Sequence, residues 1–405
     1  MGWRMIGNPF GWIQQQLMTL LTGWGLSQAW AAAVLSLVGA VILATVLLVS
    51  TFFLIWAERK LLARMQDRLG PNRVGPWGVF QTVADLVKLL GKEIVTPAGV
   101  DRFIYYLAPL LVVMSVVGIW AVIPLAPGVQ GTALDVGVLY VVAVGAIGEL
   151  GILMAGYSSN NKYALLGAFR AVAQLVSYEV PMVLVLLVPT ILAGSMNLEV
   201  IVQQQSPMWF VLVAPLACLI FLITSLAENG RAPFDLLEAE SELVAGFNTE
   251  YSALAFGMFY VAEFLHAFTA GAVIATLFLG GWRGPGAETY PILGFVYFLA
   301  KTLVMWFLSL WVRGTVPRIR IDQMLAFNWK VLTPLALAVL TTTALADKLA
   351  LELGGNQLLT NLAANTVVAL VTLAALRAYA RAQRSKEESQ RIGGLVTAAP
   401  VSRHH

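Results

Sequence analysis

The stretch ENGRAPFDLLEAESELVAGFNTEYS, residues 228–252, lies between two apolar runs that are each long enough to cross a bilayer. It has a net charge of −5 in a chain whose net charge is +3. Carboxylates crowded in this way raise one another's pKa, so some of them are expected to take up protons near neutral pH. In a soluble protein, a solvated acidic loop would be the favoured interpretation. Between two membrane spans, the stretch instead predicts a proton-handling site. Its cation is Arg231 and its carboxylates are Glu228, Asp235, Glu238, Glu240, Glu242 and Glu250.

The composition indicates a membrane protein with many spans. Hydrophobic residues make up 59% of the 405 residues, charged residues make up 12%, and the mean hydropathy is +0.79. A single cysteine, Cys218, excludes a disulfide or a cysteine-ligated cluster within the chain. His266 is the one histidine away from the C-terminus, which argues against haem or structural zinc. The sequence has no phosphate-binding loop and no dinucleotide fingerprint, so we expect no metal, cofactor or catalytic residue in this chain.

Nine apolar runs predict an all-α, polytopic fold with about nine transmembrane helices in one domain, residues 30–380. Residues 1–29 are interpreted as an interfacial lead-in with tryptophan anchors, and residues 381–405 as a disordered tail. Asn361 and Asn365 interrupt the last run and make it the weakest. The expected limits are 30–57, 103–125, 136–157, 171–194, 208–227, 251–280, 290–313, 331–350 and 360–379.

The positive charges predict the orientation of the chain. Of the 25 Lys and Arg residues, 21 fall in loops on one side of the predicted spans or in the tail after Arg377. Because Lys and Arg accumulate in cytoplasmic loops, we expect the 228–250 loop and the C-terminus in the cytoplasm. The N-terminus is then expected outside, which agrees with an odd number of spans.

The first cytoplasmic loop, residues 58–102, is predicted to contain an amphipathic helix over 79–94. Its apolar face is formed by Val79, Val83, Leu86 and Leu90, and its polar stripe by Gln81, Asp85, Lys88 and Lys92. Two interpretations remain open: the helix lies on the lipid surface, or it packs across the mouth of the bundle and walls a cavity. Trp77 and Phe80, at its start, would suit a flat aromatic ligand.

Charged residues also occur inside the predicted spans. Glu149 and Glu179 are about 12 Å, and Glu263 about 18 Å, from the cytoplasmic ends of their spans, with Lys301 at a similar depth as a possible counter-charge. Carboxylates are costly in hydrocarbon, so we interpret the three as a proton relay rather than as structural hydrogen bonds. The relay stops near mid-membrane, which suggests lateral transfer to another subunit. His266 is interpreted as a packing or hydrogen-bonding residue.

Four of these segments resemble the signature loops of one family, the H subunits of NADH-quinone oxidoreductase, which are the counterpart of mitochondrial subunit 1. The resemblance extends from about residue 53 to residue 335. The segments are ERKLLARMQDRLGPNRVGPWG (58–78), KYALLGAFRAVAQLVSYEV (162–180), AENGRAPFDLLEAESELVAGFNTEYS (227–252) and WVRGTVPRIRIDQM (311–324).

The resemblance implies a fold and a set of site residues. The 58–102 and 228–250 loops are expected to form a quinone chamber containing Arg59, Trp77, Phe80, Asp85, Glu228 and Arg231. The resemblance implies a line of buried glutamates, which are Glu149, Glu179, Glu228 and Glu263, and an acidic loop with Glu238, Glu240, Glu242 and Glu250. With Lys301 as the possible counter-charge found from its depth, these residues are expected to form the proton relay. Arg313, Arg318 and Arg320 match a basic segment that could hold peripheral subunits or anionic lipid.

The resemblance also implies a function: a membrane subunit of a proton-pumping NADH-quinone oxidoreductase in the inner or plasma membrane. Quinone would be the substrate, while FMN and iron–sulfur clusters would lie in partner subunits. The expected partners are peripheral quinone-site subunits, small membrane subunits and lipids, with no nucleic acid. Three alternatives stay open: the anchor of a related hydrogenase or of an F420H2 or plastid-type dehydrogenase, a stand-alone proton-coupled transporter, and a structural scaffold. A transporter would favour internal repeats, and none is visible.

Overall fold

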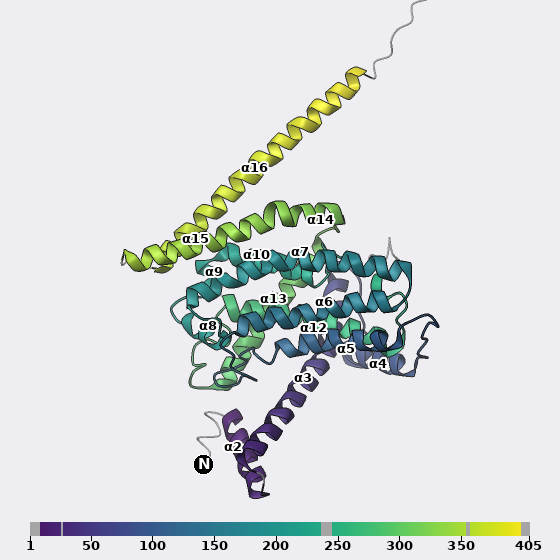
Figure 1. Cartoon of the computed structure of the whole chain (residues 1–405), viewed down its shortest axis with the longest axis vertical. Coiled ribbons are helices and arrows are strands. Elements are labelled where there is room, and N and C mark those ends of the chain that lie inside the picture. Colours follow the sequence, from purple (N-terminus) through teal and green to yellow (C-terminus); the bar gives the residue numbers. More distant parts are fainter. Residues whose placement is uncertain (1–8, 26, 236–244, 354–356, 398–405) are drawn as a thin grey trace, which may run out of the picture.

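The computed structural model describes residues 9–25, 27–235, 245–353 and 357–397. Within these residues the chain forms helices and loops and no strand, which confirms the all-α prediction. Figure 1 shows most helices packed side by side, with α2 and the start of α3 on one side of this bundle and α16 on the other. The core consists of apolar side chains contributed by all the central helices.

The described helices follow one another with short connections. In chain order they are α2 (Pro9–Gly23), α3 (Gln28–Met65), η1 (Pro76–Gly78), α4 (Gln81–Gly91), α5 (Arg102–Ile119), α6 (Gly137–Ser158), α7 (Lys162–Ala193), α8 (Leu198–Gln204), α9 (Phe210–Val213), α10 (Pro215–Glu228), η2 (Gly246–Asn248), α12 (Ala253–Phe278), α13 (Pro291–Thr315), α14 (Ile321–Phe327), η3 (Asn328–Leu332), α15 (Thr333–Glu352) and α16 (Gln357–Thr397).

The bundle has two ends, which we name after the short helices that mark them. The α4 end carries α4 and the described residues 229–235 and 245–252, and the α8 end carries α8 and the loop 279–290. Successive long helices run in alternate directions between these ends (Figure 1). Asp85, Asp235 and Glu250 therefore lie at the α4 end.

Eight of the described helices are long and apolar enough to cross a membrane, where the sequence predicted nine spans. The difference is the fifth run, expected as one helix over 208–227. It is divided at Ala214 into α9 and α10, and α10 has only 14 residues. Pro215 follows the break, and because proline has no N–H, it is tolerated at the first position of α10 but would not continue α9.

The helix α7 begins earlier than the apolar pattern indicated. The span was expected over 171–194, but Asn161 caps a helix that starts at Lys162 and has 32 residues. Its first turns carry the charged residues Lys162 and Arg170, so the apolar run in the sequence begins only after them. Glu179 consequently lies near the middle of α7 rather than close to one end.

The amphipathic helix of the first loop forms as α4, shorter than the predicted 79–94. It packs on α3 and α12. Gln81 and Asp85 are half-buried on the side of these helices, where Asp85 bonds to Arg59, whereas Lys88, Lys92 and the apolar residues Val83, Val87 and Leu90 are exposed. The helix therefore presents its apolar face outward, as a helix surrounded by lipid would.

The C-terminal helix α16 differs from the disordered tail that the sequence predicted, and it shows why asparagines occur in the last predicted span. The tail from residue 381 was expected to be disordered, but α16 continues as a helix to Thr397, and residues 398–405 lie outside the described part. Asn361 and Asn365, which weakened the predicted span, are buried against α15. The amide of Asn361 donates to Asp347, and that of Asn365 to Thr343, each at 3.3 Å. Polar side chains thus join two apolar helices.

Small residues bring α6 and α7 close together near the α4 end. A Cβ on Gly156 would lie 2.2 Å from Cβ of Ala168, so only glycine fits there. Next to this contact, the rings of Tyr105 and Tyr251 stack at 4.2 Å, and the Tyr251 hydroxyl donates to the Tyr105 carbonyl. Burial raises the pKa of Tyr251, so this hydroxyl keeps its proton as a donor. The contacts anchor the segment that leads from the acidic stretch into α12.

Candidate functional site

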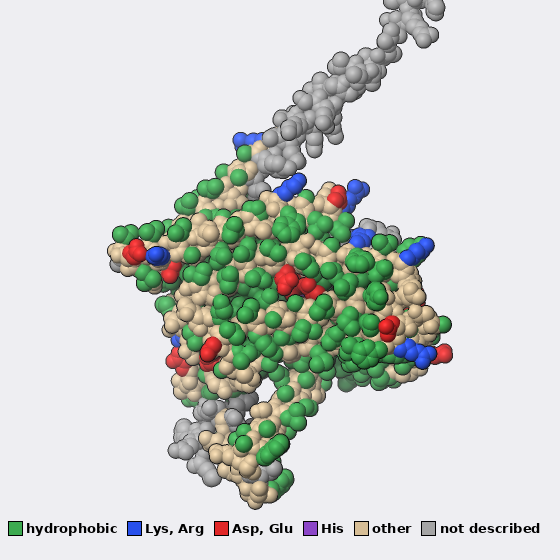
Figure 2. Space-filling view, in the orientation of Figure 1, with side chains coloured by type: hydrophobic (Ala, Val, Ile, Leu, Met, Phe, Trp, Pro, Cys, Tyr) green, Lys and Arg blue, Asp and Glu red, His purple; other side chains and the backbone are tan. Residues whose placement is uncertain are grey.

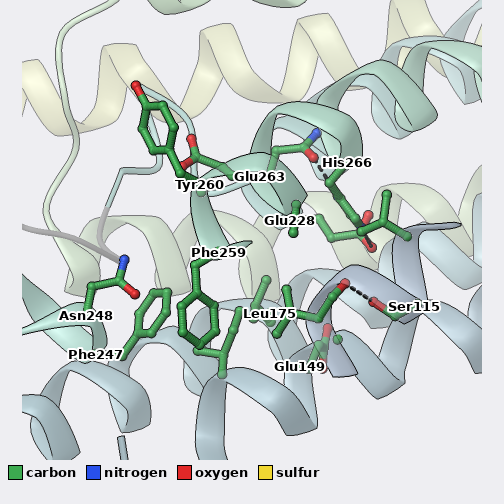
Figure 3. A pocket seen from close by; sticks show the side chains of 18 of the residues that line it. Ser115, Glu149, Leu175, Glu228, Phe247, Asn248, Phe259, Tyr260, Glu263 and His266 are labelled. Atoms are coloured by element: carbon green, nitrogen blue, oxygen red, sulfur yellow. Dashed lines mark hydrogen bonds and ion pairs between the residues drawn. The ribbon is translucent and has the colours of Figure 1, made fainter. Parts of the chain in front are cut away.

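A cavity with about 890 Å³ of empty space, including its open part, lies among α5, α6, α7, α12 and the end of α10. We call it the first cavity. Figure 3 shows Glu149, Glu228, Glu263 and His266 around it, together with Tyr260 and the aromatic rings of Phe247 and Phe259. The walls are thus largely apolar, with acidic groups contributed by three separate helices. Such a combination is typical of a site that handles a few specific charges or protons.

Glu228 and His266 form the centre of this cavity. Oε1 of Glu228 lies 3.7 Å from Nε2 of His266, whose Nδ1 lies 2.6 Å from Oδ1 of Asn229. Because Oδ1 of Asn229 can only accept, Nδ1 of His266 carries the proton in this arrangement. Nε2 of His266 is therefore unprotonated and faces Glu228, so it can accept a proton from the carboxyl group of Glu228.

A second cavity continues from the first toward the middle of the bundle. Gly145, Glu149, Glu228 and His266 line both cavities, and Glu179 of α7 lines the second one. Glu228 interacts electrostatically with both Glu149 and Glu179. The two cavities therefore arrange Glu263, Glu228, Glu149 and Glu179 in one row.

The end of this row reaches the side of the molecule. Figure 2 shows acidic side chains in the middle of an otherwise apolar face, over α6 and α7. Glu149 and Glu179 are the acidic residues of these two helices, and both are half-buried. Partly exposed carboxylates at this depth are costly against lipid, so this face is suited to contact with another membrane protein.

A cluster of buried charges closes the first cavity on the side of α3 and α13. Glu58 of α3 bonds to Arg313 of α13 with one oxygen, and its other oxygen lies 3.0 Å from Nη1 of Arg231. The Arg231 side chain is completely buried, with Nε 4.0 Å from Glu263 and the guanidinium 5.2 Å from the ring centre of Phe264. A buried charge is tolerated only with such partners, so the cluster fixes the positions of these helices around the cavity.

Four of the six residues predicted for the ligand chamber lie beside this cluster, in α4, at the end of α3 or in the loop that joins them, whereas Glu228 and Arg231 lie at the end of α10 and just after it. Arg59 Nη1 bonds to Asp85 Oδ2 at 2.6 Å, and Arg59 also interacts with Tyr260, which lines the first cavity. Trp77 is 75% exposed, and its carbonyl accepts a hydrogen bond from the indole of Trp56. Phe80 is exposed as well. The aromatic pair is thus available to a ligand or a partner at the α4 end.

Some expected relay residues lie elsewhere. Glu250 accepts from Asn161 at the α4 end and does not line either cavity. Lys301, expected as a counter-charge to the glutamates, donates at the α8 end to the carbonyls of Gly281 and Arg283, at 2.9 and 2.7 Å. Depth along a span does not specify which neighbour a side chain meets, and here it misplaced Lys301. Glu238, Glu240 and Glu242 lie outside the described residues.

Sequence reasoning missed several residues of the site: Glu58, Asn229, Tyr260 and the cavity position of His266. A signal for two of them was available. Tyr260, Glu263 and His266 are spaced three apart and therefore share one face of α12. Glu58 had no such signal, because its partners come from distant segments. Among the described residues, no group of three His, Cys, Asp or Glu side chains could hold a metal ion.

Comparisons with known proteins match most of the chain. The family model described as NADH dehydrogenase matches residues 38–344. A relative from Dehalococcoides mccartyi (strain CBDB1), named as the H subunit of NADH-quinone oxidoreductase, is 48% identical over 308 residues, which cover 76% of this chain and 86% of the relative. Relatives from Rhodospirillum centenum and Geobacter metallireducens, with names of the same kind, are 46% and 48% identical. They cover 76% and 74% of this chain and 94% and 92% of their own lengths.

Proposed function

The chain belongs to the family of NADH-quinone oxidoreductase H subunits, and we propose that its row of cavities links quinone reduction at the α4 end to proton movement in neighbouring subunits. It is a multi-pass membrane subunit of this multi-subunit oxidoreductase complex. The observation that carries the proposal is that the first and second cavities share Glu149, Glu228 and His266.

The quinone headgroup is proposed to bind where α3, α4 and the first cavity meet. Arg59 and Asp85 hold α4 against α3, and Trp77 and Phe80 offer exposed aromatic faces beside them. Glu228 and Arg231 face this region from the end of α10. A flat, partly polar headgroup needs this combination of apolar walls and a few polar groups.

Protons are proposed to pass along Glu263, Glu228, Glu149 and Glu179. His266 lies where the first and second cavities meet. A carboxylate row in a mostly apolar environment responds to a new charge nearby by redistributing protons. Reduction of quinone beside Arg231 supplies such a change of charge. Glu179, on the side of the bundle, would then exchange protons with an adjacent membrane subunit. Glu250, at the α4 end, would exchange protons with the row, and we propose the same role for Glu238, Glu240 and Glu242.

Partner subunits are proposed to supply the electron transfer. FMN and iron–sulfur clusters would be held in the peripheral arm, docked at the α4 end on the basic residues Arg313, Arg318 and Arg320, with anionic lipid at their margins. The α4 end would face the cytoplasm and the N-terminus the outside, as the distribution of Lys and Arg predicts.

The proposal is tested on the purified complex with Glu228→Gln and Glu263→Gln. Both variants keep the size of the side chain and remove its proton exchange, so assembly should be retained while NADH-quinone turnover and proton uptake fall together. NADH oxidation by a soluble artificial acceptor, which bypasses the quinone, should be unchanged.

Glu352→Gln is the matched control, because Glu352 is exposed at the α8 end. It should leave all three rates unaltered. Normal quinone turnover and normal pumping in both Glu228→Gln and Glu263→Gln would overturn the relay.

A further inference from the structure

The row of cavities does not end at Glu179, because a third void continues it toward the α8 end. This void has about 240 Å³ of empty space and shares Val141, Leu186 and Val273 with the second cavity. Its remaining lining residues are Ile123, Val138, Leu198, Thr276 and Leu277. The three spaces together extend from the α4 end almost to the opposite face of the bundle.

The third void differs from the other two in its chemistry. Within the described part of the chain, Thr276 is its single polar lining residue, and the Thr276 hydroxyl donates to the carbonyl of Ala272 in its own helix. A water molecule needs two to four polar partners to be held in a protein interior, so this void is suited to stay dry. Protons move along water or titratable groups, and a dry apolar stretch interrupts both.

The short helix α8 closes the far side of this void. Leu198, its first residue, lines the void and is buried against Gly137 of α6. The helix has only seven residues, so its place depends on bonds to its neighbours. The amide of Gln205, which follows α8, donates to the Thr276 carbonyl at 3.0 Å, and Arg283 donates to the Gln203 carbonyl at 2.6 Å.

Lys301 extends this set of bonds. Its ammonium group donates to the carbonyls of Gly281 and Arg283 and lies 4.8 Å from the ring centre of Trp209. It therefore anchors the loop that carries Arg283 and, through it, α8. This accounts for an intramembrane lysine far from the glutamates.

We propose that the apolar third void and α8 form a seal that stops protons from crossing this subunit between its α8 face and the glutamate row. The inference rests on the proposed function, since only a proton-carrying row needs a closed end. With the seal shut, protons reaching Glu179 leave only sideways, into a partner.

Passive proton leak tests the seal without any turnover. The complex is reconstituted in liposomes with an entrapped pH-sensitive dye, a potassium diffusion potential is applied without NADH or quinone, and proton entry is followed. Leu277→Asn places an amide in the void and should raise the leak about ten-fold or more, as expected for loss of a barrier of about 1.4 kcal/mol. Leu277→Met, similar in volume and apolar, should remain tight.

A second pair of variants changes two side chains of the loop 279–290, outside the void itself. Arg283→Met removes the bond to the Gln203 carbonyl and should increase the leak. Arg283 also donates to the Ser206 hydroxyl and to Glu288. Glu288→Gln alters a partner of Arg283 that lies outside α8 and should not increase the leak. If Leu277→Asn does not assemble, this second pair decides alone.

Two results separate the seal from the relay. If the proton leak of Arg283→Met disappears when Glu228→Gln is added, the result supports both the seal and the relay. If the leak persists in the double variant, the seal is supported, but the leaking protons do not pass along the glutamate row. Assembled Leu277→Asn and Arg283→Met complexes that are as tight as their controls would overturn the seal, whatever the coupled activity of the glutamate variants.

Discussion

The carboxylate of Glu58, on α3, lies 3.0 Å from the guanidinium of Arg231, in the segment that follows α10. Both side chains are buried, and the second oxygen of Glu58 bonds to Arg313. One acidic residue at the end of the first span therefore holds two cations from two other segments. This arrangement fixes the wall of the first cavity next to Glu263.

Replacement of Glu58 by Gln should destabilise the protein strongly. The change removes the nearer acidic partner of the completely buried Arg231 and leaves it beside Glu263, at 4.0 Å. Breaking a buried ion pair from one side costs about 3–5 kcal/mol. We expect less assembled complex and a lower Tm, measured by thermal unfolding of the detergent-solubilised complex.

The control for Glu58→Gln is Lys348→Gln, which removes one partner of the exposed pair Lys348–Glu352. Exposed pairs contribute about 1 kcal/mol or less, so the Tm should hardly change. Equal stability of the two variants would contradict the role assigned to Glu58.

Asp85→Asn should affect quinone more than it affects stability. The Arg59–Asp85 pair is partly exposed, with about a third of each side chain accessible, so its loss should cost about 1 kcal/mol or less of unfolding free energy. The pair nevertheless sets the distance between α3 and α4, which wall the proposed headgroup site. We expect the apparent KM for quinone to rise about five-fold.

A comparison within α4 checks this assignment. Lys88→Gln changes an exposed charge on the same helix and should leave the KM unaltered. The double variant Arg59→Gln/Asp85→Asn should be no worse than Arg59→Gln alone, because Asp85→Asn then removes only an interaction that is already lost. Additive effects would show that the two residues act separately.

The sequence predicted the class of fold well and its irregular parts poorly. Long apolar runs form helices, because a backbone in lipid must satisfy its own hydrogen bonds. Eight of the nine predicted spans are confirmed as helices of sufficient length. The break at Ala214 depends on how α9 and α10 pack in the bundle. Pro215, inside the apolar run, was the available sign of it. Similarly, the period of α4 predicted an amphipathic helix, but not that Asp85 would bond to Arg59 while Lys88 and Lys92 stay exposed.

For the site, the sequence located single residues but not their partners. Depth within a span identified Glu149, Glu179 and Glu263, three of the four glutamates that line the cavities. It misplaced Lys301, because depth carries no information on which helix a side chain faces. The contact of Glu58 with Arg231 joins segments that only the folded chain brings together.

Gly156→Ala should separate α6 from α7 and disturb the glutamate row. The added Cβ would meet Cβ of Ala168 at 2.2 Å and the carbonyl of Ala164 at 2.8 Å, and neither atom belongs to a flexible side chain. Overpacking of this kind costs about 1–3 kcal/mol. Because Glu149 and Glu179 lie on these two helices, proton pumping per NADH should fall along with the Tm.

Gly39→Ala provides the matched control. Gly39 lies in α3, and a Cβ there would meet no atom within 4 Å. The same substitution should then be neutral or slightly stabilising, since alanine favours a helix over glycine by roughly 1 kcal/mol. A Gly156→Ala complex with the Tm and pumping of the Gly39→Ala complex would show that α6 and α7 can adjust.

Asn361→Leu/Asn365→Leu should loosen α16 without altering quinone reduction. The two amides make side-chain hydrogen bonds between α15 and α16, and such bonds contribute about 0.6 kcal/mol each in membranes. The helix α16 lies beyond residue 344, where the match to the family model ends, and none of its residues lines the first or second cavity, so quinone reduction should be unaffected. Hydrogen exchange of residues 357–375 in lipid nanodiscs should become faster.

Thr366→Val is the control, because the Thr366 hydroxyl is exposed and bonds to Ala363 in its own helix. If exchange in the Asn double variant is as slow as in Thr366→Val, apolar packing alone holds α16 against α15. The hydrogen bonds of the two asparagines then contribute nothing to this contact.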